Sequence, residues 1–433
     1  MYTAKISLSD LPASPEEFRV KALAWADTFT LVAYYYDHNI PYPYEGFKHL
    51  LAVSNNKPIP IIQEQSFADL RKVLQGQQPI ICGYLGYDLK NQVEKLSSHN
   101  KDTLSFPGIL FFEPEVNLYF NYDTLNVSYT SGDVKSIVDA ILATPLPSDS
   151  SSGPLQVKQR VTPEKYKRNV ERIRHHIVEG NVYELNYCME FFAEDVCIAP
   201  LPLYLSLCKA SPTPFSGYLK FEDKYLLCAS PERFLKKEGE KLISQPIKGT
   251  IRRGSTPEED LELQQQLRND EKELAENMMI VDLVRNDLSR SCATGTVKVE
   301  EMFGIYGFRQ VFQMISTITG ELKPGKDLVD ALVGTFPMGS MTGAPKISAM
   351  QLIEELEETK RGLYSGAFGY ITSDQDCDFN VVIRSIQYNS SKRYLSFMVG
   401  SAITFDSAPD REYEECLLKA QAILQVLNAH LSE

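Results

Sequence analysis

Two helix-forming segments separated by strand-like ones limit the fold more than any other feature of this sequence. Residues 258–290 and 411–431 are rich in helix-forming residues and contain neither glycine nor proline. Between them lie β-branched stretches punctuated by glycine, such as 311–322 (VFQMISTITGEL), 366–373 (GAFGYITS) and 379–388 (FNVVIRSIQY), which alternate in the manner of strands. The pattern predicts a mixed α and β protein in which sheet dominates.

The earlier part of the chain carries the same two signals. Residues 80–91 (IICGYLGYDLKN) predict a buried strand that ends in a glycine turn, and residues 32–39 (VAYYYDHN) predict sheet. Residues 162–181 predict an amphipathic helix with Thr162 as N-cap and Pro163 at the first position.

A composition break divides the chain. Residues 145–156 (PLPSDSSSGPLQ) replace periodic sequence with Ser, Pro and Gly, which cannot bury enough apolar surface to order themselves. We therefore expect an N-terminal part over residues 1–144, a linker over 145–156 and a larger C-terminal part over 157–430.

Charge and cysteine usage exclude several classes of protein. A net charge of −13 over 433 residues repels phosphate backbones and anionic lipid, so we expect no nucleic acid and no membrane as partner. The chain has no recognisable leader and no run of about 18 apolar residues, and its eight cysteines form no CxxC pair. These features predict reduced, mostly buried thiols and a cytoplasmic location.

Histidine usage narrows the possible chemistry. The six histidines leave none between residues 177 and 429, which disfavours Ser-His-Asp and Cys-His catalysis in the later part of the chain. No GxxxxGK[ST] loop is present, and no GxGxxG follows a strand.

Two ExxE pairs indicate a possible metal site. Glu273 and Glu276 share one face of a predicted helix, and Glu412 and Glu415 repeat the spacing on the last helix. If the pairs converge, their hard oxygen ligands suit Mg²⁺ better than zinc. The alternative is two solvated helix faces.

Three further features have both a structural and a functional interpretation. Lys248, in PIKGT (246–250), is either a surface lysine or a functional amine. Arg384 interrupts an apolar run and either forms a buried ion pair or binds a carboxylate. The glycine-rich stretch 336–350 is either a connecting loop or a helix start that presents N–H groups to an anion.

Taken together, these stretches resemble the chorismate-using enzymes, a family that includes anthranilate synthase component I, aminodeoxychorismate synthase component I, isochorismate synthase and salicylate synthase. The resemblance covers roughly residues 160–425, and GYLGYDL in the N-terminal third extends it. The segments that carry it are SPERFL (230–235), PIKGTIRRG (246–254), AENMMIVDLVRNDL (275–288), FPMGSMTGAPK (336–346), YSGAFGYI (364–371), VVIRSI (381–386) and GSAITFDSAPDREYEECLLKA (400–420).

The resemblance implies the fold class α/β (α+β). It implies a single large chorismate-binding fold of two packed, mostly antiparallel sheets with flanking helices, and a site in the cleft between the sheets. The linker over 145–156 would then be a surface loop within one fold. It would join an N-terminal part (1–144) that resembles the N-terminal region of anthranilate synthase component I to a chorismate-binding catalytic region (157–430).

Lys248 points to one member of the family. Anthranilate synthases typically carry alanine at this position, whereas aminodeoxychorismate synthases carry lysine. The resemblance thus implies an aminodeoxychorismate synthase component I that converts chorismate and ammonia to 4-amino-4-deoxychorismate, with anthranilate synthase component I as the alternative. Lys248 would be the nucleophile, with a pKa lowered by burial or by a nearby cation, and Glu232 the general acid or base.

The resemblance also implies the remaining site residues. Mg²⁺ would be bound directly by Glu276 and Glu415 and through water by Glu273 and Glu412. The positions that match those holding the two substrate carboxylates are Gly249, Thr250, Tyr364, Arg384, Gly400 and Ser401.

Some positions depart from the family pattern. Water-using members carry a lysine near the position of Glu184, and many members carry histidine where this chain has Gln313. The run GSA (400–402) replaces a more glycine-rich one. No glutaminase motif of the GxCxG type is present, so we expect ammonia to come from a separate glutamine amidotransferase subunit.

Overall fold

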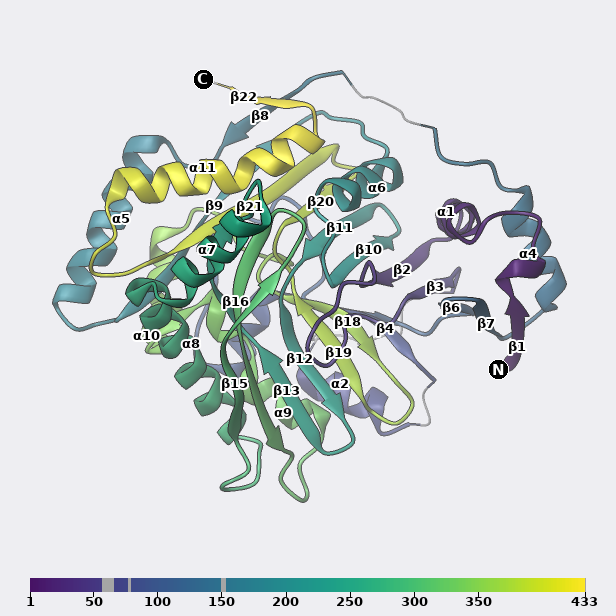
Figure 1. Cartoon of the computed structure of the whole chain (residues 1–433), viewed down its shortest axis with the longest axis horizontal. Helices are drawn as coiled ribbons and strands as arrows, with labels where there is room; N and C mark the ends of the chain where they lie inside the picture. The colour runs from purple at the N-terminus through teal and green to yellow at the C-terminus, as the bar shows by residue number, and fades with distance from the viewer. Residues whose placement is uncertain (57–65, 77–78, 149–152, 433) are drawn as a thin grey trace.

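The computed structural model describes residues 1–56, 66–76, 79–148 and 153–432 of the chain (Figure 1). Two large sheets lie face to face, and helices cover the outer face of each. Residues 149–152 of the predicted linker lie outside the described residues. The fold class predicted from the sequence is confirmed.

The first sheet has 13 strands and is antiparallel except at β22, which pairs with β8 in parallel. Its strands lie in the order β1 (Tyr2–Ser7), β7 (Thr124–Tyr129), β6 (Val116–Phe120), β3 (Leu50–Ser54), β2 (Leu31–Tyr36), β10 (Phe215–Phe221), β11 (Lys224–Ser230), β20 (Ser385–Asn389), β21 (Tyr394–Ile403), β9 (Glu184–Ala193), β8 (Leu155–Gln159) and β22 (Ala429–Leu431), with β17 (Gly343–Ala344) beside β9.

The second sheet has nine strands, all antiparallel. Their order is β14 (Ile247–Arg252), β16 (Val311–Glu321), β13 (Lys241–Gln245), β12 (Arg233–Glu238), β19 (Cys377–Val381), β18 (Ala367–Ile371), β4 (Ile81–Leu85) and β5 (Ile109–Phe112), with β15 (Lys298–Gly307) also paired to β16. Strands from the first 144 residues therefore lie in both sheets.

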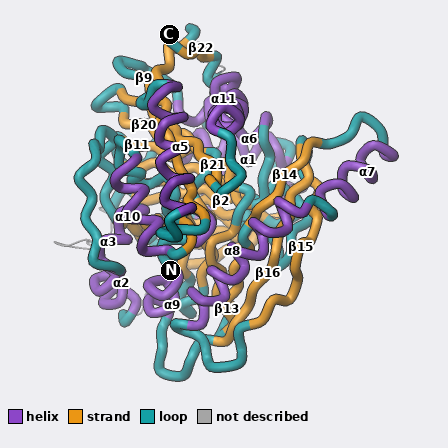
Figure 2. Tube along the Cα trace, turned by 90° about the vertical axis from the view of Figure 1, so that its left-hand side faces the viewer, coloured by secondary structure: helices purple, strands orange, loops and turns teal. Residues whose placement is uncertain are grey.

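Helices cover both outer faces (Figure 2). Against the first sheet pack α1 (Pro15–Ala26), α4 (Val134–Ala143), α5 (Pro163–Val178), α6 (Pro200–Ala210), α10 (Lys346–Leu356) and α11 (Pro409–Val426). Against the second pack α2 (Phe67–Leu74), α8 (Glu271–Ser289) and α9 (Leu328–Thr335). Two further helices are α3 (Lys90–Val93) and α7 (Pro257–Arg268), and the short 3₁₀ turns span Leu8–Asp10, Tyr87–Leu89 and Gly339–Met341.

Strand alternation builds the core between the sheets. In β2, Val32 and Tyr34 pack against helices, whereas Ala33 and Tyr35 face the second sheet, because successive side chains of a strand point to opposite faces. The Tyr35 ring stacks on Phe368 of β18 at a centroid distance of 4.6 Å. Such pairs tie the two sheets together over their shared apolar layer.

Two predictions from local sequence are confirmed, namely the start of one helix and the burial of most cysteines. Helix α5 begins after Thr162, whose hydroxyl accepts a hydrogen bond from the Lys165 N–H, as predicted. Of the eight cysteines, all are free and only Cys197 is exposed. No helix among the described residues is long and apolar enough to cross a membrane.

Three predicted elements were wrong in extent. The helix predicted over 258–290 is two helices, because Asp270 caps α8 through the N–H groups of Lys272 and Glu273. The helix predicted over 411–431 ends at Val426, and Ala429–Leu431 pairs as β22. The strand predicted over 379–388 breaks at Arg384, whose φ is 48°.

Candidate active site

Lys248 lies where an edge of the second sheet meets the first sheet. It belongs to β14, and Glu184 begins β9 of the first sheet. The Lys248 Nζ donates to Glu184 Oε1 at 2.7 Å, with 11% and 1% of the two side chains exposed. Lys248 is therefore not the surface lysine of the alternative interpretation.

The expectation of a lowered lysine pKa is wrong in this structure. Burial alone lowers the pKa of Lys248, but the carboxylates of Glu184, Glu276 and Glu232 together raise it above the ordinary value. The ammonium form is favoured because three acidic groups surround it and the nearest accepts its hydrogen bond.

Glu232 lies between β11 and β12 and is 4% exposed. Burial raises the pKa of Glu232 to about 7, although the nearby cations Lys248 and Arg384 act in the opposite direction. A carboxyl with such a pKa exchanges a proton near neutral pH, which suits a general acid or base. A small pocket lies beside Glu232, lined also by Ser340, Gly339 and Pro246.

Arg384 occupies the break between β19 and β20. No hydrogen bond or ion pair engages its guanidinium among the described residues, so the buried ion pair of the structural interpretation is not formed. Burial lowers the pKa of Arg384, and Glu232 partly offsets this effect. An unpaired guanidinium within electrostatic range of the Glu232 carboxyl suits the binding of an anionic group.

The other predicted substrate positions lie on neighbouring elements. Gly249 has a φ of 98°, which a side chain would strain, and Thr250 pairs with Gln313 across β14 and β16. Gly400 lies so close to β9 that an added Cβ would be 2.4 Å from Cys188 Sγ. The Cys188 thiol contacts the Tyr364 hydroxyl at 3.9 Å, and Ser401 Oγ donates to Glu412 Oε2 at 2.7 Å.

The four glutamates of the ExxE pairs face one another from α8 and α11. Lys272, in the first turn of α8, interacts electrostatically with all four of them, and these carboxylates raise its pKa although burial lowers it. As the side chains stand, no three His, Cys, Asp or Glu side chains in the part of the chain described are close enough together to hold a metal ion. Coordination by both pairs would require the side chains to draw together.

The donor chemistry of these glutamates nevertheless fits Mg²⁺. All four donors are carboxylates, and Oε1 of Glu276 is buried without a hydrogen-bond partner among the described residues. The ammonium of Lys272 lies 3.6 Å from that oxygen, as a monodentate ion pair. A hard divalent cation would satisfy this oxygen and the net negative charge of the group.

Several contacts of the site were not predicted from the sequence. Glu184 was noted only because it replaces a lysine, and Lys272 and Asn277 were not singled out. The Asn277 amide donates to the Lys248 carbonyl at 3.1 Å, which ties α8 to β14. Asn277 directly follows Glu276, so its position on the helix was the only available signal.

The glycine-rich stretch 336–350 serves a structural contact. Helix α10 begins at Lys346, whose buried ammonium donates to Asp287 Oδ2 at 2.5 Å and to the Pro337 carbonyl at 2.8 Å.

Gln313, on β16, is 3% exposed and its Oε1 has no hydrogen-bond partner among the described residues.

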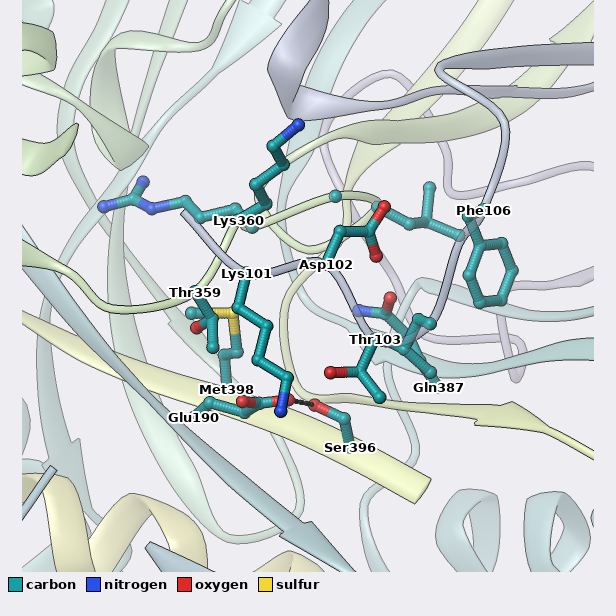
Figure 3. A pocket seen from close by; sticks show the side chains of 14 residues that line it. Lys101, Asp102, Thr103, Phe106, Glu190, Thr359, Lys360, Gln387, Ser396 and Met398 are labelled. Atoms are coloured by element: carbon teal, nitrogen blue, oxygen red, sulfur yellow. Dashed lines mark hydrogen bonds between the residues drawn. The ribbon is translucent and has the colours of Figure 1, made fainter. Parts of the chain in front are cut away.

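A second pocket, shown in Figure 3, is separate from this group of residues. It is lined by Lys101, Asp102, Glu190, Lys360, Gln387 and Ser396 among others, and by none of the predicted site residues. The Glu190 carboxylate there is already engaged, because Oε1 accepts from Ser396 Oγ and Oε2 pairs with Arg160.

The chain is similar to known proteins in sequence and in fold. The family model described as chorismate binding enzyme matches residues 28–425. Anthranilate synthase component 1 of Thermus thermophilus is 36% identical over 80% of this chain and 77% of its own length. Aminodeoxychorismate synthase component 1 of Bacillus subtilis is 34% identical over 80% and 76%. The crystal structure of anthranilate synthase component I from Streptococcus pneumoniae superposes with a TM-score of 0.73 at 28% identity, over 91% of this chain and 90% of that one.

Proposed function

The chain belongs to the chorismate binding enzymes, and from this we propose that it is an aminodeoxychorismate synthase component 1. It would convert chorismate and ammonia to 4-amino-4-deoxychorismate, a precursor of 4-aminobenzoate and folate. That the chain is a chorismate-utilising enzyme follows from the family. The choice of this member is our proposal.

The observation that carries the proposal is the position of Lys248. Its Nζ donates a hydrogen bond to Glu184 and lies within electrostatic range of Glu232. A primary amine placed there can add to the substrate ring, whereas alanine, typical of anthranilate synthases, cannot. In addition, Glu184 stands where water-using members carry a lysine.

The proposed reaction has two displacements. Lys248 adds to C2 of the chorismate ring while the C4 hydroxyl leaves, and Glu232 protonates that hydroxyl so that it departs as water. Ammonia then attacks C4 and expels the lysine, and Glu232 takes the excess proton from the new amine. The unpaired Arg384 guanidinium binds a substrate carboxylate.

Magnesium completes the proposed site. Glu276 and Glu415 would bind Mg²⁺ directly, and Glu273 and Glu412 would bind it through water. The ion would neutralise the ring carboxylate of the substrate. A net charge of −13 makes such local positive charge necessary for binding a dianion.

Anthranilate synthase component 1 remains the second candidate, because the Thermus thermophilus relative of that name is 36% identical. In either case the nitrogen would come from a separate glutamine amidotransferase subunit, with free ammonia as a substitute in the assay.

The test is the identity of the product. Purified protein, chorismate, Mg²⁺ and an ammonium salt are incubated at mildly alkaline pH, and the products are separated by chromatography with mass detection, beside Lys248→Ala. We expect 4-amino-4-deoxychorismate from the wild type and a loss of at least about 100-fold in the variant. Anthranilate as the main product would overturn the proposal.

A further inference from the structure

Among the residues that the structure describes, the Lys248 ammonium forms one hydrogen bond, to a carboxylate that the proposed reaction does not use. Glu184 Oε1 accepts it at 2.7 Å, and Glu184 Oε2 is buried without a partner among the described residues. The side chain is 1% exposed. A buried carboxylate with one free oxygen has room for a proton.

The charged groups facing Lys248 come from every element packed around it. They are Glu184 on β9, Glu232 between β11 and β12, Glu273 and Glu276 on α8, and Glu415 on α11. Among them only Glu184 is within hydrogen-bond distance of Nζ among the described residues. A proton leaving Lys248 therefore has one direct acceptor.

The negative charge around Lys248 opposes the loss of its proton, and Glu184 is placed to accept that proton. The Glu184 carboxylate, hydrogen-bonded to Nζ, favours the ammonium form of Lys248, yet only a neutral amine can attack the ring. Passing the proton to Glu184 turns a buried ion pair into a neutral pair without moving charge to solvent. Losing the proton to solvent instead would leave the Glu184 carboxylate buried without a countercharge, which costs more than forming the neutral pair.

We propose that Glu184 is the base that takes a proton from Lys248 before attack and returns it after the lysine is expelled. This inference rests on the proposed function. It assigns Glu184 a chemical role in the covalent step.

The protons and electrons balance. The Lys248 ammonium gives one proton to Glu184, and the free amine uses its lone pair to form the bond to C2, while the two ring double bonds each shift one position towards C4; they shift back in the second displacement. The C4–O bond breaks, and the oxygen takes the proton of Glu232 and leaves as water. After ammonia attack the lysine departs as neutral amine with the electron pair of its bond, and Glu184 reprotonates it.

The two possible roles of Glu184 predict opposite pH behaviour. With Glu184 as base, the reactive state carries one proton shared by the pair, so it persists at neutral pH. In Glu184→Gln the amine must lose its proton to solvent, and its reactive fraction rises about tenfold per pH unit until its own pKa. If Glu184 only held the lysine in its charged form, its removal would lower the lysine pKa and speed the attack.

The experiment measures covalent attachment of chorismate in the presence of Mg²⁺ and the absence of ammonia, by rapid quench and intact-protein mass between pH 6 and 9. We expect the rate of Glu184→Gln relative to wild type to be down about 100-fold at pH 7 and to rise about tenfold per pH unit. Glu184→Asp, which keeps a carboxylate, should give a ratio that does not change with pH.

The control is Glu190→Gln on the same strand. Glu190 also forms a buried ion pair, with Arg160 at 2.9 Å, but lies outside the site. Its relative rate should be independent of pH. A pH-independent ratio for Glu184→Gln, or a rate at pH 7 within about threefold of wild type, overturns the inference alone. Absence of any adduct in the wild type overturns the proposed function and the inference with it.

Discussion

At the scale of single residues, burial acts differently on the two groups proposed to move protons in the first displacement. Glu232 is buried with two cations in range and still has a raised pKa, because desolvation outweighs both of them. Lys248 is buried among carboxylates and also has a raised pKa, because here the carboxylates outweigh desolvation. In the proposed reaction Glu232 can therefore donate a proton near neutral pH, whereas Lys248 needs a base.

Glu232→Gln tests the acid. A pKa raised to about 7 means that Glu232 is mostly protonated below pH 7 and loses its proton above it. Adduct formation in the wild type should therefore fall as pH rises through about 7. In Glu232→Gln we expect a rate lower by about 10²–10⁴ and no such limb, measured by rapid quench without ammonia. An unchanged limb would contradict the role of Glu232.

Candidate site residues could be selected from the sequence because each lies in a recognisable segment. The contact between Lys248 and Glu184 could not be predicted from the sequence. The two residues belong to different sheets, and no local sequence pattern indicates that they lie close together. The raised lysine pKa depends on the same long-range contacts, so burial alone gave the wrong direction.

At the scale of elements, capping and backbone breaks decide the site. Asp270 ends the run of helix formers that the sequence presents as continuous, and α8 therefore starts close to its glutamates. The left-handed backbone of Arg384 separates β19 from β20 and turns that residue out of the ladder. Both breaks depend on one residue within a strong periodic pattern, which is why the pattern alone missed them.

A matched pair on α11 tests the metal proposal. Glu415 is a proposed Mg²⁺ ligand, and Glu414 is an exposed neighbour on the same helix. We expect Glu415→Gln to raise the Mg²⁺ concentration needed for half-maximal binding by at least about tenfold, since one of two direct carboxylates is lost.

The measurement is titration calorimetry with Mg²⁺ alone, followed by the activity of both variants after chelation and metal return. Glu414→Gln should match the wild type within about twofold, because this exposed carboxylate is not one of the proposed ligands and its general electrostatic effect is screened by solvent. Equal affinities for the two variants would remove Glu415 from the ligand set.

At the scale of the whole molecule, the site exists because the two sheets pack closely. The ring of Phe368 lies over Gly217, where an added Cβ would be 2.2 Å from Cε1. The Phe368 ring cannot easily move aside, because it is fully buried and stacked on Tyr35. The spacing between the sheets, and hence the distance from β14 to β9, depends on such contacts.

Gly217→Ala tests this packing. We expect it to lower the free energy of unfolding by about 1–3 kcal/mol through overpacking, as measured by urea denaturation. Gly153→Ala is the control, because no atom of the described residues lies within 4 Å of its added Cβ, and it should change stability by less than about 0.5 kcal/mol. Equal free energies of unfolding for the two variants would contradict tight packing of the sheets at Gly217.

Covalent catalysis by Lys248 is tested most directly by peptide mapping. The wild-type protein is allowed to react with chorismate and Mg²⁺ without ammonia and is then quenched and digested. We expect the peptide that contains Lys248 to gain the mass of chorismate less one water, and the gain to disappear on adding ammonium before the quench. A product formed at full rate with no modified Lys248 peptide at any quench time would contradict covalent catalysis by this lysine.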